Sequence, residues 1–228
     1  MDIHGLQKTT LLDFPGQVAC TVFLAGCNLR CPFCHNAPLV CGSAPPQLAQ
    51  EEFFAFLKKR SGILDGVCIT GGEPTLRPDL PQFAAGIREL GYKVKLDTNG
   101  SNPAMLRRLL EAGLLDYVAM DIKNAPTRYA QTCGGVDVLD AVKQSAALLM
   151  ESGIDYEFRT TCVHPLHDAQ AMEEIGNWLA GARSYYLQNF VDSGNLVGTG
   201  VTGLPPQTME ALRQAVLPYI NNTQLRGI

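Results

Sequence analysis

Short apolar segments rich in β-branched and aromatic residues alternate along the chain with longer segments whose apolar residues recur every three or four positions. The short segments predict strands. Several are apolar at consecutive positions, which is typical of strands buried on both faces of a parallel sheet. Six strands are predicted, over residues 18–24, 66–70, 92–98, 115–122, 154–163 and 185–190.

The segments between these strands have the apolar spacing of helices. A strand followed by a helix, repeated about six times, predicts a βα array. An open sheet and an incomplete barrel share this order, so the periodicity leaves both possible. In either case, functional groups are expected at the carboxyl ends of the strands. With no linker-like stretch, one domain is predicted over residues 1–228, with its core over about 16–190 and a C-terminal loop and helix over 191–228.

Composition narrows the class of protein. The chain has 228 residues, of which 46% are hydrophobic and 18% charged, as in ordinary globular proteins. The net charge of −4 argues against nucleic acid as the main partner. No apolar run is long enough to span a membrane, and the first residues lack the pattern of a signal peptide. We therefore expect a cytoplasmic protein without membrane association.

Three of the eight cysteines, Cys27, Cys31 and Cys34, are clustered directly after the first predicted strand. Clustered thiolates in a reducing compartment favour a metal or redox site. A structural zinc site would need a fourth ligand, from Cys41 or His35. An iron–sulfur cluster of the [4Fe–4S] type, held by three thiolates, would instead keep one iron open for a small molecule.

The next four strand ends also carry polar or glycine-rich groups. Taken alone, each group is a weak signal, because Gly-Gly turns and Asp-Thr-Asn-Gly turns are common, and a buried arginine often pairs with a structural carboxylate. Their shared position on one rim, together with the thiols, favours a functional site. In chain order, the groups are Gly71-Gly72-Glu73, Asp97-Thr98-Asn99-Gly100, Asp121 with Lys123, and Arg159.

These motifs carry a family resemblance. CNLRCPFC, with Phe33 as its aromatic residue, resembles the signature of the radical S-adenosylmethionine (SAM) enzymes, and GGEP matches their methionine-binding motif. DTNG and MDIK resemble motifs of the glycyl-radical-enzyme activases. The segment LLDFPGQVACTVFLAGCNLRCPFCHNAPL is most similar to the longer form of the activating proteins of anaerobic ribonucleoside-triphosphate reductase. The resemblance extends over residues 11–159.

The resemblance implies an α/β fold, a partial (β/α)6 barrel of parallel strands. It also implies a [4Fe–4S] cluster on Cys27, Cys31 and Cys34, with SAM on the fourth iron. A monovalent cation is expected beside the SAM carboxylate, held by Asp97, Asp121 and the Met120 carbonyl. The residues expected to bind SAM are Phe33, Gly71, Gly72, Glu73, Asn99, Asp121, Lys123 and Arg159.

The implied reaction is reductive cleavage of SAM, with reduced flavodoxin as the electron donor. The resulting 5′-deoxyadenosyl radical would take a hydrogen atom from a glycine of a partner enzyme, expected to be anaerobic ribonucleoside-triphosphate reductase. Two other functions stay open. One is a radical SAM enzyme acting on another glycyl-radical enzyme, a small molecule or a peptide. The other is a non-catalytic metal-binding module, which would leave GGEP, DTNG and MDIK unexplained.

The chain departs from related activases after the sixth strand, where Gln188, Asn189 and Asp192 stand without the histidine found in those proteins. The resemblance therefore does not identify which residues of this chain contact the substrate. A second group of clustered cysteines is also missing, which predicts a single cluster. The glycine-rich segment 194–203 is expected to be either a flexible lip for a partner or a plain loop.

The other cysteines and two of the histidines are expected to be structural or exposed. Cysteines inside strands are expected in the core as small apolar residues, and they are Cys20, Cys68 and Cys162. Cys41 and Cys133 are expected in loops, and His164 and His167 at a surface turn around Pro165.

Overall fold

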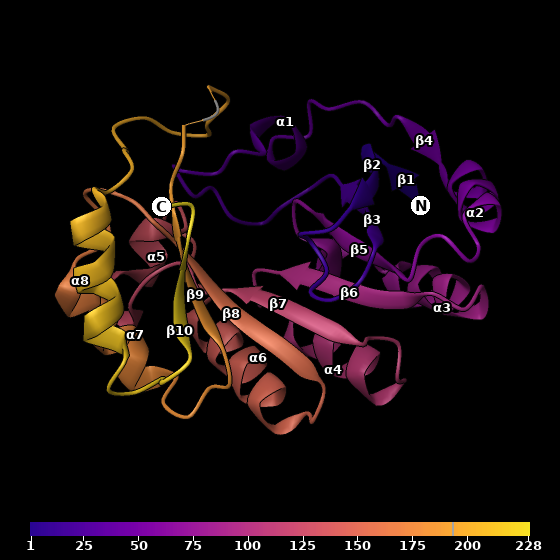
Figure 1. The fold of residues 1–228 in the computed structure, drawn as a ribbon. Coiled ribbons are helices and arrows are strands. Elements are labelled where there is room, and N and C mark those ends of the chain that lie inside the picture. Colours follow the sequence, from indigo (N-terminus) through magenta and orange to yellow (C-terminus); the bar gives the residue numbers. More distant parts are fainter. Residues whose placement is uncertain (193) are drawn as a thin grey trace.

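The computed structural model describes residues 1–192 and 194–228, and its largest element is an eight-stranded sheet (Figure 1). Each strand is parallel to its neighbours except β2, which is antiparallel to β3. From edge to edge the strands are β2 (Gly5–Thr10), β3 (Ala19–Leu24), β5 (Gly66–Gly71), β6 (Lys93–Thr98), β7 (Tyr117–Asp121), β8 (Asp155–Cys162), β9 (Tyr185–Asn189) and β10 (Thr223–Arg226). Within the described ranges the two edge strands do not pair, so the curved sheet stays open.

The six predicted strands correspond to β3 and β5–β9, and the mostly parallel α/β fold is confirmed. The sequence did not predict the two edge strands. Strand β2, GLQKTT, is largely exposed, and β10 has four residues of which one is buried. Neither segment has the continuous apolar pattern of a strand covered on both faces.

Helices cover the outer side of the curved sheet (Figure 1). The long helices are α2 (Gln50–Lys59), α3 (Leu80–Glu89), α4 (Pro103–Glu111), α6 (Leu139–Glu151), α7 (Ala169–Trp178) and α8 (Pro206–Val216). Shorter elements are α1 (Ala37–Val40), α5 (Tyr129–Thr132) and a ribbon formed by β1 (Asp2–Ile3) and β4 (Leu48–Ala49). Side-chain caps fix two helix starts, because Asn102 accepts from the Met105 N–H and Asp168 accepts from the Ala171 N–H.

The core lies between the sheet and these helices and includes Cys20 and Cys162, as expected. Cys68 is also fully buried, but its sulfur lies 3.7 Å from Asp97 Oδ1 and 3.8 Å from Lys95 Nζ, outside that core. An aromatic group joins α2 to α3. The Phe83 ring centroid lies 5.6 Å from that of Phe53 and 5.7 Å from that of Phe54. Apolar burial at this contact holds α2 and α3 against each other.

None of the helices described here has the length and apolar character needed to cross a membrane.

We expect Phe83→Ala to lower the free energy of unfolding by about 3–5 kcal/mol, because it leaves a cavity between two helices and the sheet. Chemical denaturation measures this loss. Ile63→Ala is the control: its side chain is 57% exposed, and its removal should change stability by less than about 0.5 kcal/mol. Equal effects of the two substitutions would contradict this description of the core.

Candidate active site

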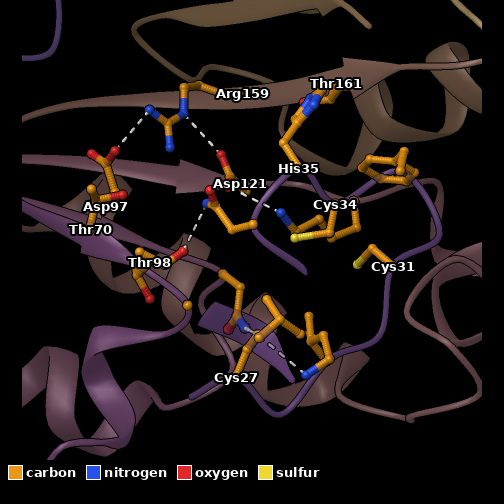
Figure 2. Close-up of a pocket in the computed structure, with 18 residues that line it drawn as sticks. Cys27, Cys31, Cys34, His35, Thr70, Asp97, Thr98, Asp121, Arg159 and Thr161 are labelled. Atoms are coloured by element: carbon orange, nitrogen blue, oxygen red, sulfur yellow. Dashed lines mark hydrogen bonds and ion pairs between the residues drawn. The ribbon is translucent and has the colours of Figure 1, made fainter. Parts of the chain in front are cut away.

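A cavity of about 190 Å³ lies at the carboxyl ends of the central strands, beneath the cysteine loop (residues 25–36) that follows β3 (Figure 2). Cys27, Cys31 and Cys34 line it together with Phe33. The strand ends contribute the rest of the predicted site, namely Gly71, Gly72, Asp97, Asn99, Asp121, Lys123 and Arg159. The structure therefore brings together all of the predicted site residues except Glu73 and Met120.

The glycine pair allows the end of β5 to lie directly against the start of the cysteine loop. Gly71 has a φ of +119°, and a Cβ on Gly72 would lie 2.1 Å from the Gly26 carbonyl oxygen. The Gly72 N–H donates to the Leu24 carbonyl at 2.8 Å, and the Glu73 N–H donates to that of Gly26 at 2.7 Å. Two adjacent residues without side chains are thus required to position this loop.

Glu73 is buried behind the cavity wall rather than facing the cavity. Its carboxylate accepts hydrogen bonds from the N–H and hydroxyl of Thr75, from the Thr98 hydroxyl and from the Asn99 N–H. Burial raises the pKa of Glu73, and these four donors oppose that effect by stabilising the charged form. Its observed contacts join the ends of β5 and β6, and its contact with the SAM amino group stays a prediction.

Asn99 connects this turn to the cysteine loop. Its Nδ2 donates to the Asn28 side-chain oxygen at 3.1 Å and lies 3.8 Å from the Cys27 sulfur. The Ser101 N–H donates to the Asn99 side-chain oxygen and fixes the amide orientation. Glu73 therefore positions Asn99, which in turn contacts the loop that carries the thiols.

The three clustered thiols have different electrostatic surroundings. Burial raises the pKa of Cys27 and that of Cys34. A hydrogen bond from the Cys133 side chain lowers the pKa of Cys31. Cys133 lies in a turn directly after α5, in agreement with the predicted loop, but it is fully buried there, and its carbonyl accepts from the Arg30 N–H at 3.1 Å. Contacts between distant segments produce this arrangement, so the local sequence gave no indication of it.

The residues considered as a fourth zinc ligand lie apart from one another. Cys41 is exposed at the end of α1 and does not line the cavity. His35 lines the cavity, with its ring stacked on Phe190 at a centroid distance of 5.2 Å. Within residues 1–192 and 194–228, no three or more His, Cys, Asp or Glu side chains are grouped to hold a single metal ion.

Five charged side chains form a continuous row across β6, β7 and β8 (Figure 2 shows its central part). Lys95 pairs with one Asp97 oxygen, and Arg159 Nη1 lies 3.3 Å from the other. Arg159 Nε lies 2.9 Å from one Asp121 oxygen, and Lys123 Nζ lies 3.0 Å from the other. Lys95 was not predicted, although its position two residues before Asp97 places both side chains on the same face of β6.

The row keeps both carboxylates ionised. Burial opposes the charged form of Asp121, but the neighbouring charges of Arg159 and Lys123 lower its pKa to about 2. Burial also opposes ionisation of Asp97, and Arg159 and Lys95 hold the pKa of that carboxyl below its usual value. Met120, the third expected cation ligand, lies inside β7, in register with Thr98 and Phe158.

His167 also differs from the expectation of a surface turn. His164 is exposed, but His167 is buried. Its Nδ1 accepts from the Val163 N–H at 3.1 Å, and its Nε2 lies 2.9 Å from the Lys123 carbonyl oxygen. The edge of the ring meets Phe33 at a centroid distance of 6.1 Å. His167 therefore supports two cavity residues from behind.

The glycine-rich segment 194–203 lies against the cysteine loop. The Val197 N–H donates to the Cys34 carbonyl at 3.3 Å, and the Gly198 N–H donates to that of Pro32 at 2.9 Å. The Asn189 side chain exchanges two hydrogen bonds of 2.9 Å with the backbone of Leu204. Ser193, which precedes the segment, lies outside the described residues.

Comparison with known proteins agrees with this geometry. The family model of the radical SAM superfamily matches residues 21–179. The chain belongs to the radical SAM superfamily. It is a radical SAM enzyme, and such enzymes use a [4Fe–4S] cluster together with SAM.

Individual relatives give further detail. The chain is 30% identical, over 99% of its length and 96% of the relative's, to a Methanocaldococcus jannaschii protein named provisionally as a glycyl-radical enzyme activating enzyme. Its fold is similar to that of SuiB of Streptococcus suis, solved with SAM (TM-score 0.70, 15% identity, 91% of this chain and 52% of SuiB). It is also similar to a domain of a pyruvate-formate lyase-activating enzyme from Bacteroides vulgatus (TM-score 0.59, 16% identity, 71% of this chain and 99% of that domain).

The donor set at this radical SAM site fits the cluster. Three thiols from one short loop border one cavity, and a three-thiolate [4Fe–4S] cluster requires such a set. Among the cavity-lining residues, Lys123 and Arg159 carry the positive charge that suits a carboxylate such as that of SAM. Cys27, Cys31 and Cys34 would hold the cluster, which supplies one electron to bound SAM.

We expect Gly72→Ala to destabilise the enzyme by about 3 kcal/mol or more, because the new methyl group would overlap the Gly26 carbonyl. Thermal unfolding measures this change, and iron content after anaerobic reconstitution should fall with it. Gly5→Ala is the matched control. Its methyl group would meet only the Phe23 side chain, at 3.2 Å, and should cost less than about 1 kcal/mol. A stable Gly72→Ala protein with full iron content would refute the role of this contact.

We expect Cys27→Ala, Cys31→Ala and Cys34→Ala each to abolish assembly of a normal cluster, because each removes one thiolate ligand. Iron and sulfide analysis and the visible charge-transfer absorption of anaerobically reconstituted protein measure the loss. Cys41→Ala, which changes an exposed thiol outside the cavity, should retain the wild-type spectrum. If Cys41→Ala lost the cluster and Cys27→Ala kept it, the assignment of ligands would be wrong.

Proposed function

We propose that this radical SAM enzyme is an activase that generates a glycyl radical on a partner protein. The observation that carries the proposal is the similarity to the M. jannaschii relative, which extends over nearly the full length of both chains. Bound cluster and SAM would supply a one-electron cleavage that yields methionine and a 5′-deoxyadenosyl radical, which takes a hydrogen atom from a glycine Cα. The residues of this chain would bind SAM, orient it and exclude water.

The charges of the row support SAM binding. The row as a whole has three cationic and two anionic side chains, and four of them, Asp97, Asp121, Lys123 and Arg159, line the cavity, whereas Lys95 lies behind Asp97. Lys123 and Arg159, which line the cavity, are proposed to bind the SAM carboxylate. Phe33 is proposed to contact the adenine, with His167 behind it limiting its movement.

A second cavity supports a protein loop as the substrate. Its volume is about 590 Å³, and it shares two lining residues, Asp97 and Arg159, with the first cavity. Leu11 and Leu12, which also line it, are 72% and 89% exposed. An apolar border on a cavity next to the proposed SAM site suits a partner loop that must bring a glycine to the radical.

The proposed partner is anaerobic ribonucleoside-triphosphate reductase, with reduced flavodoxin as the electron donor. The support for this partner is the likeness of the segment LLDFPGQVACTVFLAGCNLRCPFCHNAPL to the activating proteins of that reductase. The segment includes both Leu11–Leu12 and the cysteine loop. It therefore contributes to the proposed partner surface and to the cluster site.

Electron paramagnetic resonance tests the proposal. The reconstituted enzyme, SAM and reduced flavodoxin are mixed without air with the reductase from the same cell. We expect a glycine-centred doublet on the reductase, together with 5′-deoxyadenosine and methionine. The Cys31→Ala protein, which lacks a cluster ligand, serves as the negative control.

Three other results would each correct a different part of the proposal. A doublet on another glycyl-radical enzyme, with none on the reductase, would keep the activase function and replace the partner. SAM cleavage without a radical on any such enzyme would favour a small-molecule or peptide substrate. Release of S-adenosylhomocysteine in place of 5′-deoxyadenosine would exclude reductive cleavage.

A further inference from the structure

The two carboxylates expected to hold a monovalent cation have no oxygen left without a cationic partner. Lys95 and Arg159 bind the two Asp97 oxygens, and Arg159 and Lys123 bind the two Asp121 oxygens. Figure 2 shows the Arg159 guanidinium between the two carboxylates, with its contacts to both. A metal cation bound there would have to displace at least one of these contacts.

Charge balance also disfavours an additional cation. The five side chains carry three positive and two negative charges, so the SAM carboxylate would balance them, and a monovalent cation would add an uncompensated positive charge. Lys95 is 2% exposed, and Asp97 and Arg159 are each 15% exposed, so solvent would screen the added charge poorly. The residues present therefore do not fit the expected cation site in this arrangement.

The geometry of arginine suits this position. A guanidinium is planar and carries its donors in fixed directions, so one group can bind two carboxylates at once. Arg159 uses Nε for Asp121 and Nη1 for Asp97, at 2.9 and 3.3 Å. A bound cation would connect the two carboxylates by coordination, whereas Arg159 connects them by charge-assisted hydrogen bonds.

We propose that Arg159 takes the place of a bound monovalent cation in this enzyme, so that neither folding nor SAM binding requires K⁺ or Na⁺. In addition to its proposed contact with the SAM carboxylate, Arg159 positions Asp97 and Asp121. The proposal concerns the SAM site and is independent of which protein receives the radical. If the activase function were wrong, the proposal about Arg159 could still be correct. If the proposal about Arg159 were wrong, the activase function could still be correct.

The first test uses the wild-type enzyme. The reconstituted protein is titrated with SAM in KCl, NaCl or choline chloride at equal ionic strength, and thermal unfolding is followed in the same salts. We expect SAM dissociation constants that agree within about twofold and equal melting temperatures. If K⁺ or Na⁺ tightened SAM binding by about tenfold over choline, the enzyme would use a cation and the proposal would be wrong.

The second test removes the guanidinium. Arg159→Ala leaves the two carboxylates facing each other, so we expect KCl to raise the melting temperature of this variant above its value in choline chloride. Arg159→Met, which keeps more of the side-chain bulk without the charge, measures the same response if the alanine variant does not fold. Arg159→Lys, which restores one positive charge, should respond less to KCl.

Arg226→Ala is the matched control for this second test. Arg226 also lines the second cavity and makes two 2.9 Å contacts with the buried Glu157, but it does not bridge two carboxylates. Its removal should lower stability equally in every salt. If KCl changed the melting temperature of the folded Arg159 variants no more than that of Arg226→Ala, Arg159 would not replace a cation and the proposal would be overturned.

Discussion

The close backbone contact between the end of β5 and the start of the cysteine loop is the constraint on which the site depends. Gly71 and Gly72 lie against Leu24 and Gly26 with no room for a side chain. That contact fixes where the cysteine loop begins. On the other side of the turn, Glu73 fixes Thr98 and Asn99 by hydrogen bonds, and Asn99 contacts the loop again. The thiols are thus positioned by the close backbone contact of the glycine pair and by the hydrogen bonds of one buried carboxylate.

Strand register determines the second feature of the site, the row of charges. Asp121 and Arg159 are register partners on β7 and β8, and Lys95 and Asp97 are two residues apart on β6. Side chains alternate between the two faces of a strand, so a slip of one residue would move any of these charges to the helix-covered face. The hydrophobic residues that fix the register therefore also maintain the pairing at the cofactor cavity.

Local sequence patterns were sufficient to predict the strands that are buried on both faces. Several of the six central strands have continuous apolar segments, and the cysteine spacing and strand-end motifs are readable without the fold. The edge strands β2 and β10 were missed because their exposed faces have no such pattern. His167 was placed incorrectly, and the burial of Cys133 and the hydrogen bonds of Glu73 were not predicted, for a different reason. Their partners, such as Thr98, Arg30 and Lys123, lie far away in the sequence. The sequence indicated that Arg159 needs a partner, but only the register identifies Asp97 and Asp121.

The hydrogen bonds from Val197 and Gly198 to the cysteine loop have a consequence for biosynthesis. The loop that carries the thiols is synthesised before its partners Val197 and Gly198. Until they leave the ribosome, the carbonyls of Pro32 and Cys34 lack these two donors, and that side of the loop is uncovered. These two contacts with the cysteine loop can therefore form only after both segments have been synthesised.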